Sequence, residues 1–300
     1  MMKTPYRTAV KAVAVSLLYL LLCALLATGL AYPLHHVSGG GIDFRVAVTR
    51  GSLIMAILGA GFWIRRLQLD YDSLGLGGSR KGRLTAVGQG LASGIVMLGL
   101  HCLILVSLGV RELDMQALGS VRRVMTGLMQ AAGIGLVVAT IEECLFRGVL
   151  LAALRRSAGT LVAVLFSALY YAILHFFRVN RSLDLPDPSV YSSFVVLAQA
   201  LKPVFMPPVG PSLALFFAGL FLALVRLYRP HGLACCIGIH AGWIFVIKSC
   251  KTFTDARPLN EWAFLAGSYD GFTGFLAAGW MAALTLALAG WLYRQRRVAS

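Results

Sequence analysis

Residues 133–156 read GIGLVVATIEECLFRGVLLAALRR, and this stretch decides the class of fold. A transmembrane helix needs about 20 mostly apolar residues, and the stretch meets that length. Its apolar residues run on without the alternation that marks a strand of a transmembrane barrel. The stretch therefore predicts a membrane-spanning α-helix that carries Glu142, Glu143 and Arg147 within it.

The composition of the whole chain leads to the same class. Of its 300 residues, 58% are hydrophobic and only 13% are charged, whereas soluble domains carry about 25% charged residues. So little charge cannot cover a water-facing surface, and lipid is the expected solvent. A bilayer admits only helices or closed barrels. The prediction is an all-α, polytopic integral membrane bundle that forms a single membrane domain over residues 1–300.

Hydropathy predicts about eight transmembrane helices. One further apolar segment, residues 191–206, is short, contains Lys202 and ends in proline-rich sequence, so we interpret it as a re-entrant or interfacial helix. The eight predicted spans cover residues 10–32, 46–64, 85–109, 124–154, 160–177, 211–228, 232–249 and 272–293.

The net charge of +15 is spread over short clusters between the apolar runs. Nucleic-acid binding would gather such charge on one soluble face, so no nucleic-acid partner is expected. Basic residues are concentrated in the loops of one side, for example at Arg65, Arg66, Arg155 and Arg156, while acids nearly balance the loops of the other side. The positive-inside rule then predicts cytoplasmic termini, in a cell (inner) membrane if the protein is bacterial.

The cysteines and one glycine-rich loop suggest no chemistry of their own. No CxxC pair is present, so neither a structural zinc site nor a disulfide framework is expected, and the cysteines are interpreted as small buried residues. They are Cys23, Cys102, Cys144, Cys235, Cys236 and Cys250. The loop 65–83 contains three close glycines but neither GxGxxG nor GK[ST], which favours a flexible connector over a phosphate-binding loop.

Ionisable residues inside the spans are the candidates for function, because a charge is costly in hydrocarbon. At about 1.5 Å of rise per residue, Glu142, His175 and His240 lie roughly 20, 22 and 14 Å from the cytoplasmic ends of their spans. Three helices can thus bring them together at similar depth, as sites in helical bundles are built. For each histidine alone, a hydrogen bond to a neighbouring helix is the alternative interpretation. His101 has no obvious partner and is interpreted as structural.

Within residues 133–156, the spacing separates two roles. Glu143 and Arg147 stand at i and i+4 with the acid first, the favourable order for an ion pair. Such a pair neutralises both buried charges. Glu142 points about 100° away around the helix, which makes its carboxylate available as a general base.

These residues resemble three motifs of the CPBP intramembrane proteases, which include CAAX prenyl endopeptidases and bacterial abortive-infection-type proteins. Glu142–Arg147 resembles the EExxxR motif, and Tyr171–His175 resembles FxxxH with Tyr in place of Phe. Residues 238–243, GIHAGW, resemble the third motif. The resemblance covers about residues 128–250, interpreted as a catalytic core, and leaves residues 1–127 as accessory N-terminal helices.

The resemblance implies an endopeptidase that hydrolyses a peptide bond of a membrane-associated peptide or protein, as in CAAX processing. It implies that Glu142 and His175 activate a water and that His240 holds the oxyanion, with Glu143 and Arg147 supporting the site. Glu142, His175 and His240 are also candidate zinc ligands, since one Glu and two His can bind zinc with an open position. The firmer zinc motif HExxH is absent.

One position departs from the family pattern. The third motif usually reads HxxxN or HxxxD, and Ile244 stands at its last position. Losing one oxyanion donor costs about 2.7–4 kcal/mol of transition-state stabilisation. Either His240 acts alone, another donor substitutes, or the chain is not a fast protease. A non-catalytic CPBP-fold scaffold or immunity protein and a proton-coupled transporter are the alternative functions, although no internal repeat supports a transporter.

Overall fold

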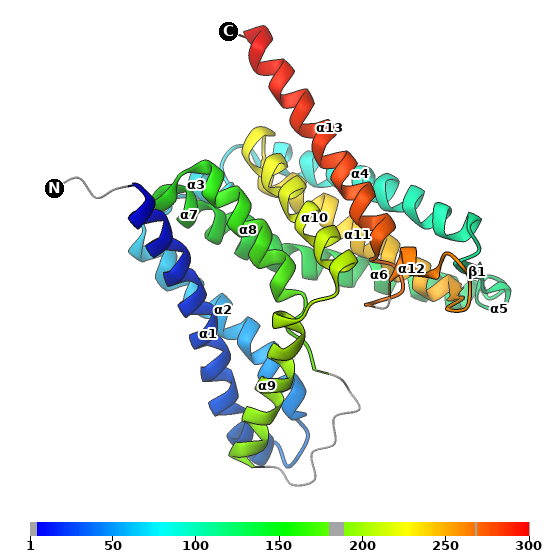
Figure 1. The fold of residues 1–300 in the computed structure, drawn as a ribbon, viewed down its shortest axis with the longest axis horizontal. Helices are drawn as coiled ribbons and strands as arrows, with labels where there is room; N and C mark the ends of the chain where they lie inside the picture. Colours follow the sequence, from blue (N-terminus) through cyan, green and yellow to red (C-terminus); the bar gives the residue numbers. More distant parts are fainter. Residues whose placement is uncertain (1–4, 180–188, 268, 300) are drawn as a thin grey trace. The chain divides into compact units, whose positions relative to one another are not determined.

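The computed structural model describes residues 5–179, 189–267 and 269–299, which are largely helical (Figure 1). The chain divides into two compact units. The first consists of Met1–Leu69 and Val149–Pro208, and the second of Asp70–Gly148 and Val209–Ser300. The positions of the two units relative to one another are not determined, so each is described by itself.

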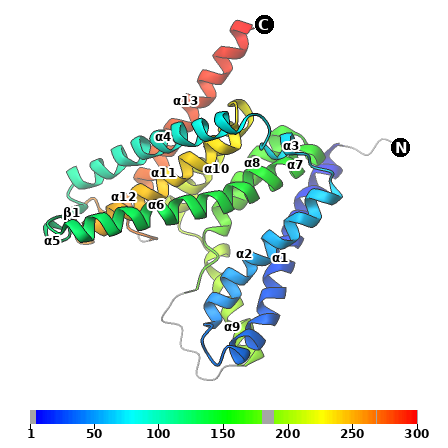
Figure 2. The ribbon, with the colours of Figure 1, turned by 180° about the vertical axis from the view of Figure 1, so that it is seen from behind.

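The first unit is a helical bundle in which α1 runs along α2 and both contact α9 (Figures 1 and 2). Its helices are α1 (Pro5–Val37), α2 (Phe44–Arg66), α7 (Leu151–Ala158), α8 (Thr160–Leu174) and α9 (Val190–Phe205). Small side chains such as Ala24, Ala31 and Ala47 belong to the shared core, which lets the helices approach closely. Asp43 begins α2, because its carboxylate accepts a hydrogen bond from the Arg45 N–H.

The second unit is organised around α11, which contacts α4, α6 and α10, while α10 packs on α13. The π-helical segment η1 continues α6 and leads into α7. The elements are α3 (Tyr71–Leu74), α4 (Arg80–Ser107), β1 (Arg111–Leu113), α5 (Met115–Leu118), α6 (Val121–Glu143), η1 (Cys144–Leu150), α10 (Val209–Tyr228), α11 (Gly232–Phe253), β2 (Thr254–Ala256), α12 (Ala263–Ala266) and α13 (Phe275–Ala299).

Glycines set the close approach of α4 and α11. Gly90 and Gly94 of α4 face the backbone of α11, and a methyl group at either would collide with a carbonyl oxygen there. Gly238 and Gly242 of α11 meet the backbone of α4 in the same way. Each helix thus carries a GxxxG pattern, which allows two membrane helices to pack backbone to backbone. The packing fixes the helix that carries His240.

A disulfide and a small sheet close the far end of this helix pair. Cys102 of α4 is bonded to Cys250 of α11, so the prediction that the cysteines form no disulfide was wrong. The two residues are 148 positions apart, and sequence alone does not give connectivity. Directly beyond the disulfide, β1 pairs antiparallel with β2, with Glu112 opposite Asp255.

Within residues 5–179, 189–267 and 269–299, seven helices are long and apolar enough to cross a membrane, which confirms the polytopic helical class. The fifth predicted span, 160–177, is the 15-residue α8, which ends at Leu174. It and the 16-residue α9 are shorter than a usual span of about 20 residues. Among the described residues, seven of the eight predicted spans are long helices and one is the shorter α8, while α9 corresponds to segment 191–206, predicted separately as a short re-entrant or interfacial helix. The predicted core 128–250 draws on both units, and its separation from residues 1–127 stays a prediction, as does the side of the termini.

Candidate active site

The candidate site lies where α6 changes its helical geometry. The α-helix ends at Glu143, and Cys144–Leu150 form a π-helix. Such segments are rare and occur frequently at functional sites, because the wider turn redirects side chains and backbone groups. The sequence predicted an uninterrupted span over residues 124–154 and contained no indication of this change. The two glutamates thus stand on the last α-helical residues before the π-helix.

Glu143 and Arg147 form the buried ion pair that their spacing predicts. Arg147 Nη1 lies 3.2 Å from Glu143 Oε1, and both side chains are 0% exposed. Arg147 Nη2 donates a second hydrogen bond, of 3.3 Å, to the carbonyl oxygen of Gly219 in α10. In a buried position each charge neutralises the other. Through Arg147, the ion-paired Glu143 carboxylate is therefore linked to α10.

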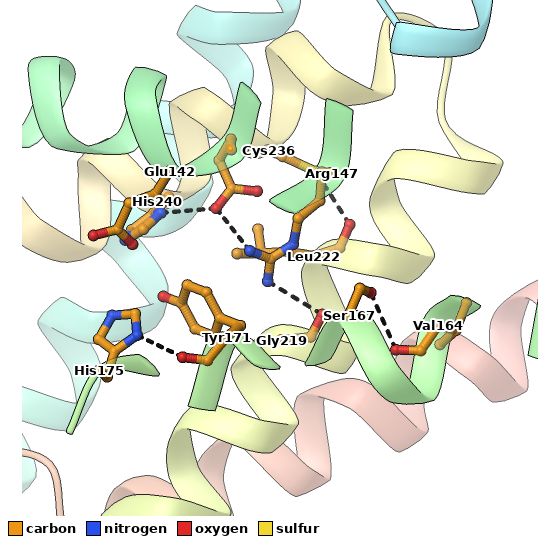
Figure 3. Close-up of polar contacts among 11 residues, drawn as sticks. Glu142, Arg147, Val164, Ser167, Tyr171, His175, Gly219, Leu222, Cys236 and His240 are labelled. Atoms are coloured by element: carbon orange, nitrogen blue, oxygen red, sulfur yellow. Dashed lines mark hydrogen bonds and ion pairs between the residues drawn. The ribbon is translucent and has the colours of Figure 1, made fainter. Parts of the chain in front are cut away.

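His240 of α11 is oriented by the same carboxylate. Its Nδ1 lies 2.8 Å from Glu143 Oε1 (Figure 3). Because Glu143 is held as a carboxylate and can only accept, Nδ1 carries the hydrogen and donates it. The other ring nitrogen, Nε2, lies 4.0 Å from Glu142 Oε2. Glu143 thus fixes the ring so that Nε2 is the nitrogen nearer to Glu142.

Glu142 is the more accessible of the two carboxylates. Its side chain is 22% exposed, whereas that of Glu143 is fully buried. Consecutive residues of a helix point about 100° apart, which explains why one carboxylate meets Arg147 and the other does not. The site therefore combines an ion-paired carboxylate, an imidazole that it orients, and a second carboxylate that solvent can reach.

His175 belongs to the first unit, where it follows the last residue of α8. Its Nδ1 lies 2.7 Å from the Tyr171 carbonyl oxygen, and the two rings are 4.3 Å apart. A carbonyl oxygen only accepts, so Nδ1 carries the hydrogen and donates it. Since Glu142 lies in the other unit, the meeting of Glu142 and His175 stays a prediction.

Position 244, where the motif usually has Asn, is occupied by a packing residue. Its Cβ would lie 3.6 Å from a methyl group built at Gly135 of α6, so Ile244 faces that helix and offers no donor. The preceding residue does offer one. The Trp243 ring lies 6.2 Å from the His240 ring, and its Nε1 is buried with no hydrogen-bond partner among the described residues.

Trp243 is the residue of the site to which the sequence assigned no role. The sequence showed it only as the last residue of the third motif. Neighbouring residues do not reveal that an indole N–H is buried without an acceptor. Buried donors almost always have a partner, so such a group calls for an explanation. His101, for which the sequence offered no obvious partner, lies with its Nε2 3.2 Å from the Phe272 carbonyl oxygen, and its structural role stays a prediction.

The second unit by itself supplies two of the three predicted zinc ligands, Glu142 and His240. In the described part of the chain, no three His, Cys, Asp or Glu side chains form a group that could hold a metal ion. Catalytic zinc takes three protein ligands and keeps one open position. Glu142 and His240 supply two groups, and Glu143 is engaged by Arg147 and His240. Because His175 belongs to the other unit, whose position relative to this one is not determined, a zinc site of Glu142, His175 and His240 stays a hypothesis, and the proposed reaction uses no metal.

Comparison with known proteins agrees with the motifs. Residues 124–246 match a family model described as Rce1-like: type II CAAX prenyl endopeptidase Rce1-like. The matched segment contains all three motifs, so the resemblance to the CPBP family is confirmed. At the level of the family, the match supports a membrane protease of the CAAX-processing class. No curated protein and no solved structure matches the chain.

Proposed function

We propose that this Rce1-like membrane protein is an intramembrane endopeptidase, which hydrolyses a peptide bond of a membrane-associated peptide or protein with a water activated by glutamate. The observation that carries the proposal is the arrangement of Arg147, Glu143 and His240 in one buried chain of contacts beside Glu142. A purely structural ion pair needs neither the imidazole nor a second carboxylate next to it.

Glu142 is the general base of this proposal. Its side chain is partly exposed, and its Oε2, an atom buried from solvent, lies 4.0 Å from His240 Nε2; we place the reacting water beside these two atoms. Glu142 takes a proton from the water, and the resulting hydroxide attacks the carbonyl carbon of the scissile bond. Protonated Glu142 then gives that proton to the leaving amine. His175, whose Nδ1–H is held by Tyr171, offers Nε2 as a second acceptor for the water.

His240 is the proposed oxyanion donor. Its Nδ1 faces Glu143 and its Nε2 lies on the side of Glu142. In the proposed step both ring nitrogens donate, Nδ1 to Glu143 and Nε2 to the developing oxyanion. Trp243 Nε1–H is the candidate second donor in place of the Asn that Ile244 replaces, since it is buried next to His240 without a partner in the described structure. Each such donor is worth about 2.7–4 kcal/mol in the transition state.

The proposal is tested by comparing protein termini in membranes from cells that carry wild type, Glu142→Gln or Glu261→Gln. Glu261 is exposed and outside the site, so its variant controls for expression and for loss of a carboxylate. Mass spectrometry of the membrane fraction should find new termini with wild type and Glu261→Gln that disappear with Glu142→Gln. Identical termini in all three strains at matched expression would contradict proteolysis.

A non-catalytic membrane scaffold or immunity protein is the second candidate, and Ile244 is the observation that favours it. The residue packs toward α6 at the position where the family usually has an oxyanion donor. A scaffold would retain its cellular effect in Glu142→Gln, because this isosteric change keeps the fold. A protease would lose that effect together with the new termini.

A further inference from the structure

The second unit contains a cationic pocket where α4 and α11 begin. Its volume is about 460 Å³, and it is lined by the start of α4 and by the link between α10 and α11. Three of its lining residues are Lys81, Arg229 and His231, and none of the residues that line it is acidic. A ligand of this pocket is therefore expected to be an anion.

The glycine-rich loop before α4 is ordered by arginines that are not part of the pocket lining. Arg83 Nη1 donates to the carbonyl oxygens of Leu76 and Gly78, at 2.8 and 2.7 Å. Arg226 Nη2 donates to the carbonyl oxygen of Ser73 at 2.7 Å. Both guanidinium groups thus bind backbone of the loop. The interpretation of this loop as a flexible connector does not account for these contacts.

Lys81 and His231 differ from those arginines. Neither side chain has a hydrogen bond, ion pair or ring contact with another described residue. His231 precedes α11 with a φ of 50° and makes no side-chain capping bond to that helix. Its ring lies directly against Gly78 and Gly82, where any side chain would collide with it. Gly78 and Gly82 thus leave space for the His231 imidazole at the pocket. The ring nitrogens of His231 make no hydrogen bond to the other described residues.

The pocket lies at the ends of three candidate spans, since two of them begin at Arg80 and Gly232 and the third ends at Tyr228. We therefore expect Lys81, Arg229 and His231 to stand near the level of lipid headgroups. On the sequence prediction this is the cytoplasmic side, where the leaflet carries anionic lipids, and basic pockets between membrane helices bind their headgroups. Thr85 and Gln89 add neutral donors to the lining.

We propose that the pocket lined by Lys81, Arg229 and His231 binds the phosphate group of an anionic phospholipid. The inference does not depend on proteolysis, because it uses none of the groups assigned to the reaction. A bound headgroup would join the starts of α4 and α11, and α11 carries His240 nine residues after His231. The lipid would therefore stabilise the helix that presents the candidate oxyanion donor.

The test measures lipid binding to the delipidated, full-length protein in detergent by native mass spectrometry. The probes are phosphatidylglycerol, phosphatidylcholine and inorganic phosphate. The variants are Lys81→Gln and His231→Asn, since Asn tolerates the left-handed backbone that His231 adopts. The control is Arg80→Gln, which removes a positive charge one residue outside the pocket lining.

Wild type and Arg80→Gln should bind phosphatidylglycerol in preference to phosphatidylcholine. Lys81→Gln should weaken phosphatidylglycerol binding about 5-fold, the effect of one cation near a membrane surface, and His231→Asn should weaken it as well. An equal loss in Arg80→Gln would show general surface attraction and overturn the pocket. Equal binding of both lipids would also overturn it. Displacement of the lipid by inorganic phosphate at the same concentration would assign the pocket to a soluble anion instead.

Discussion

Replacing Glu143 by Leu tests whether the buried ion pair holds the site together. The change leaves the Arg147 guanidinium with 0% exposure and without its carboxylate, and breaking a buried pair in this way costs about 3–5 kcal/mol. It also removes the acceptor that lies 2.8 Å from His240 Nδ1, and an unsatisfied buried donor costs about 1–3 kcal/mol. The two costs share one region and need not add, so we expect a loss of at least about 3 kcal/mol.

Two further variants test whether the loss of stability in Glu143→Leu comes from the unpaired buried charge of Arg147. In Glu143→Leu with Arg147→Met no uncompensated charge remains, so the double variant should be more stable than the single one. Asp43→Asn breaks the Arg45–Asp43 pair, whose side chains are 29% and 43% exposed, and Asn still caps α2. For such an exposed pair the loss should stay below about 1 kcal/mol.

Unfolding in mixed micelles with increasing SDS, followed by circular dichroism, gives the free energies of unfolding for all four proteins. A free energy of unfolding for Glu143→Leu within about 1 kcal/mol of the wild-type value would contradict a buried pair, because so small a loss is expected only for an exposed pair. A double variant less stable than Glu143→Leu would also contradict it, because replacing Arg147 should remove the unpaired buried charge.

Three further changes test other contacts. Trp243→Phe keeps an aromatic ring but removes the N–H, so kcat of peptide cleavage should fall about 100-fold or more with KM unchanged. Adding Ile244→Asn to this variant should recover part of the lost kcat. An unchanged kcat in Trp243→Phe would exclude the indole as a donor. Gly94→Leu should separate α4 from α11 and lower the midpoint of SDS unfolding, whereas a normal midpoint would contradict the close packing. Joint replacement of Cys102 and Cys250 by Ser should lower the free energy of unfolding by about 2–5 kcal/mol. On a gel, wild type should migrate differently when reduced and when non-reduced, because the disulfide forms. The double variant should lose this difference in mobility.

Several features followed from local sequence because their causes are local. Hydrocarbon forces the backbone to satisfy its own hydrogen bonds, so long apolar runs such as 133–156 become helices wherever they pack. The Glu143–Arg147 pair joins neighbouring turns of one helix, so its spacing was sufficient to predict it. The accessible position of Glu142 follows from the same helical rotation.

Other features depend on which helix faces which, and local sequence does not contain that information. His240 meets Glu143 across 97 positions, and Cys102 meets Cys250 across 148. In lipid every helix face is apolar, so hydropathy does not mark the face that packs on a neighbour. The π-helix that ends α6 was likewise invisible in a sequence that reads as one continuous span.

The sequence was therefore sufficient to predict the class of fold and the candidate site residues. Both depend on the lipid solvent and on the spacing of residues along one helix, which are properties of neighbouring residues. The contacts of the candidate site depend on the packing of α11 against α4 and α6. This packing brings Glu143 to His240 and turns Ile244 toward Gly135. It also buries the Trp243 N–H without a partner among the described residues. These contacts join residues that are distant in sequence, and Gly135 of α6, where a methyl group would lie 2.9 Å from the Ala241 carbonyl oxygen, lets α6 approach α11 closely.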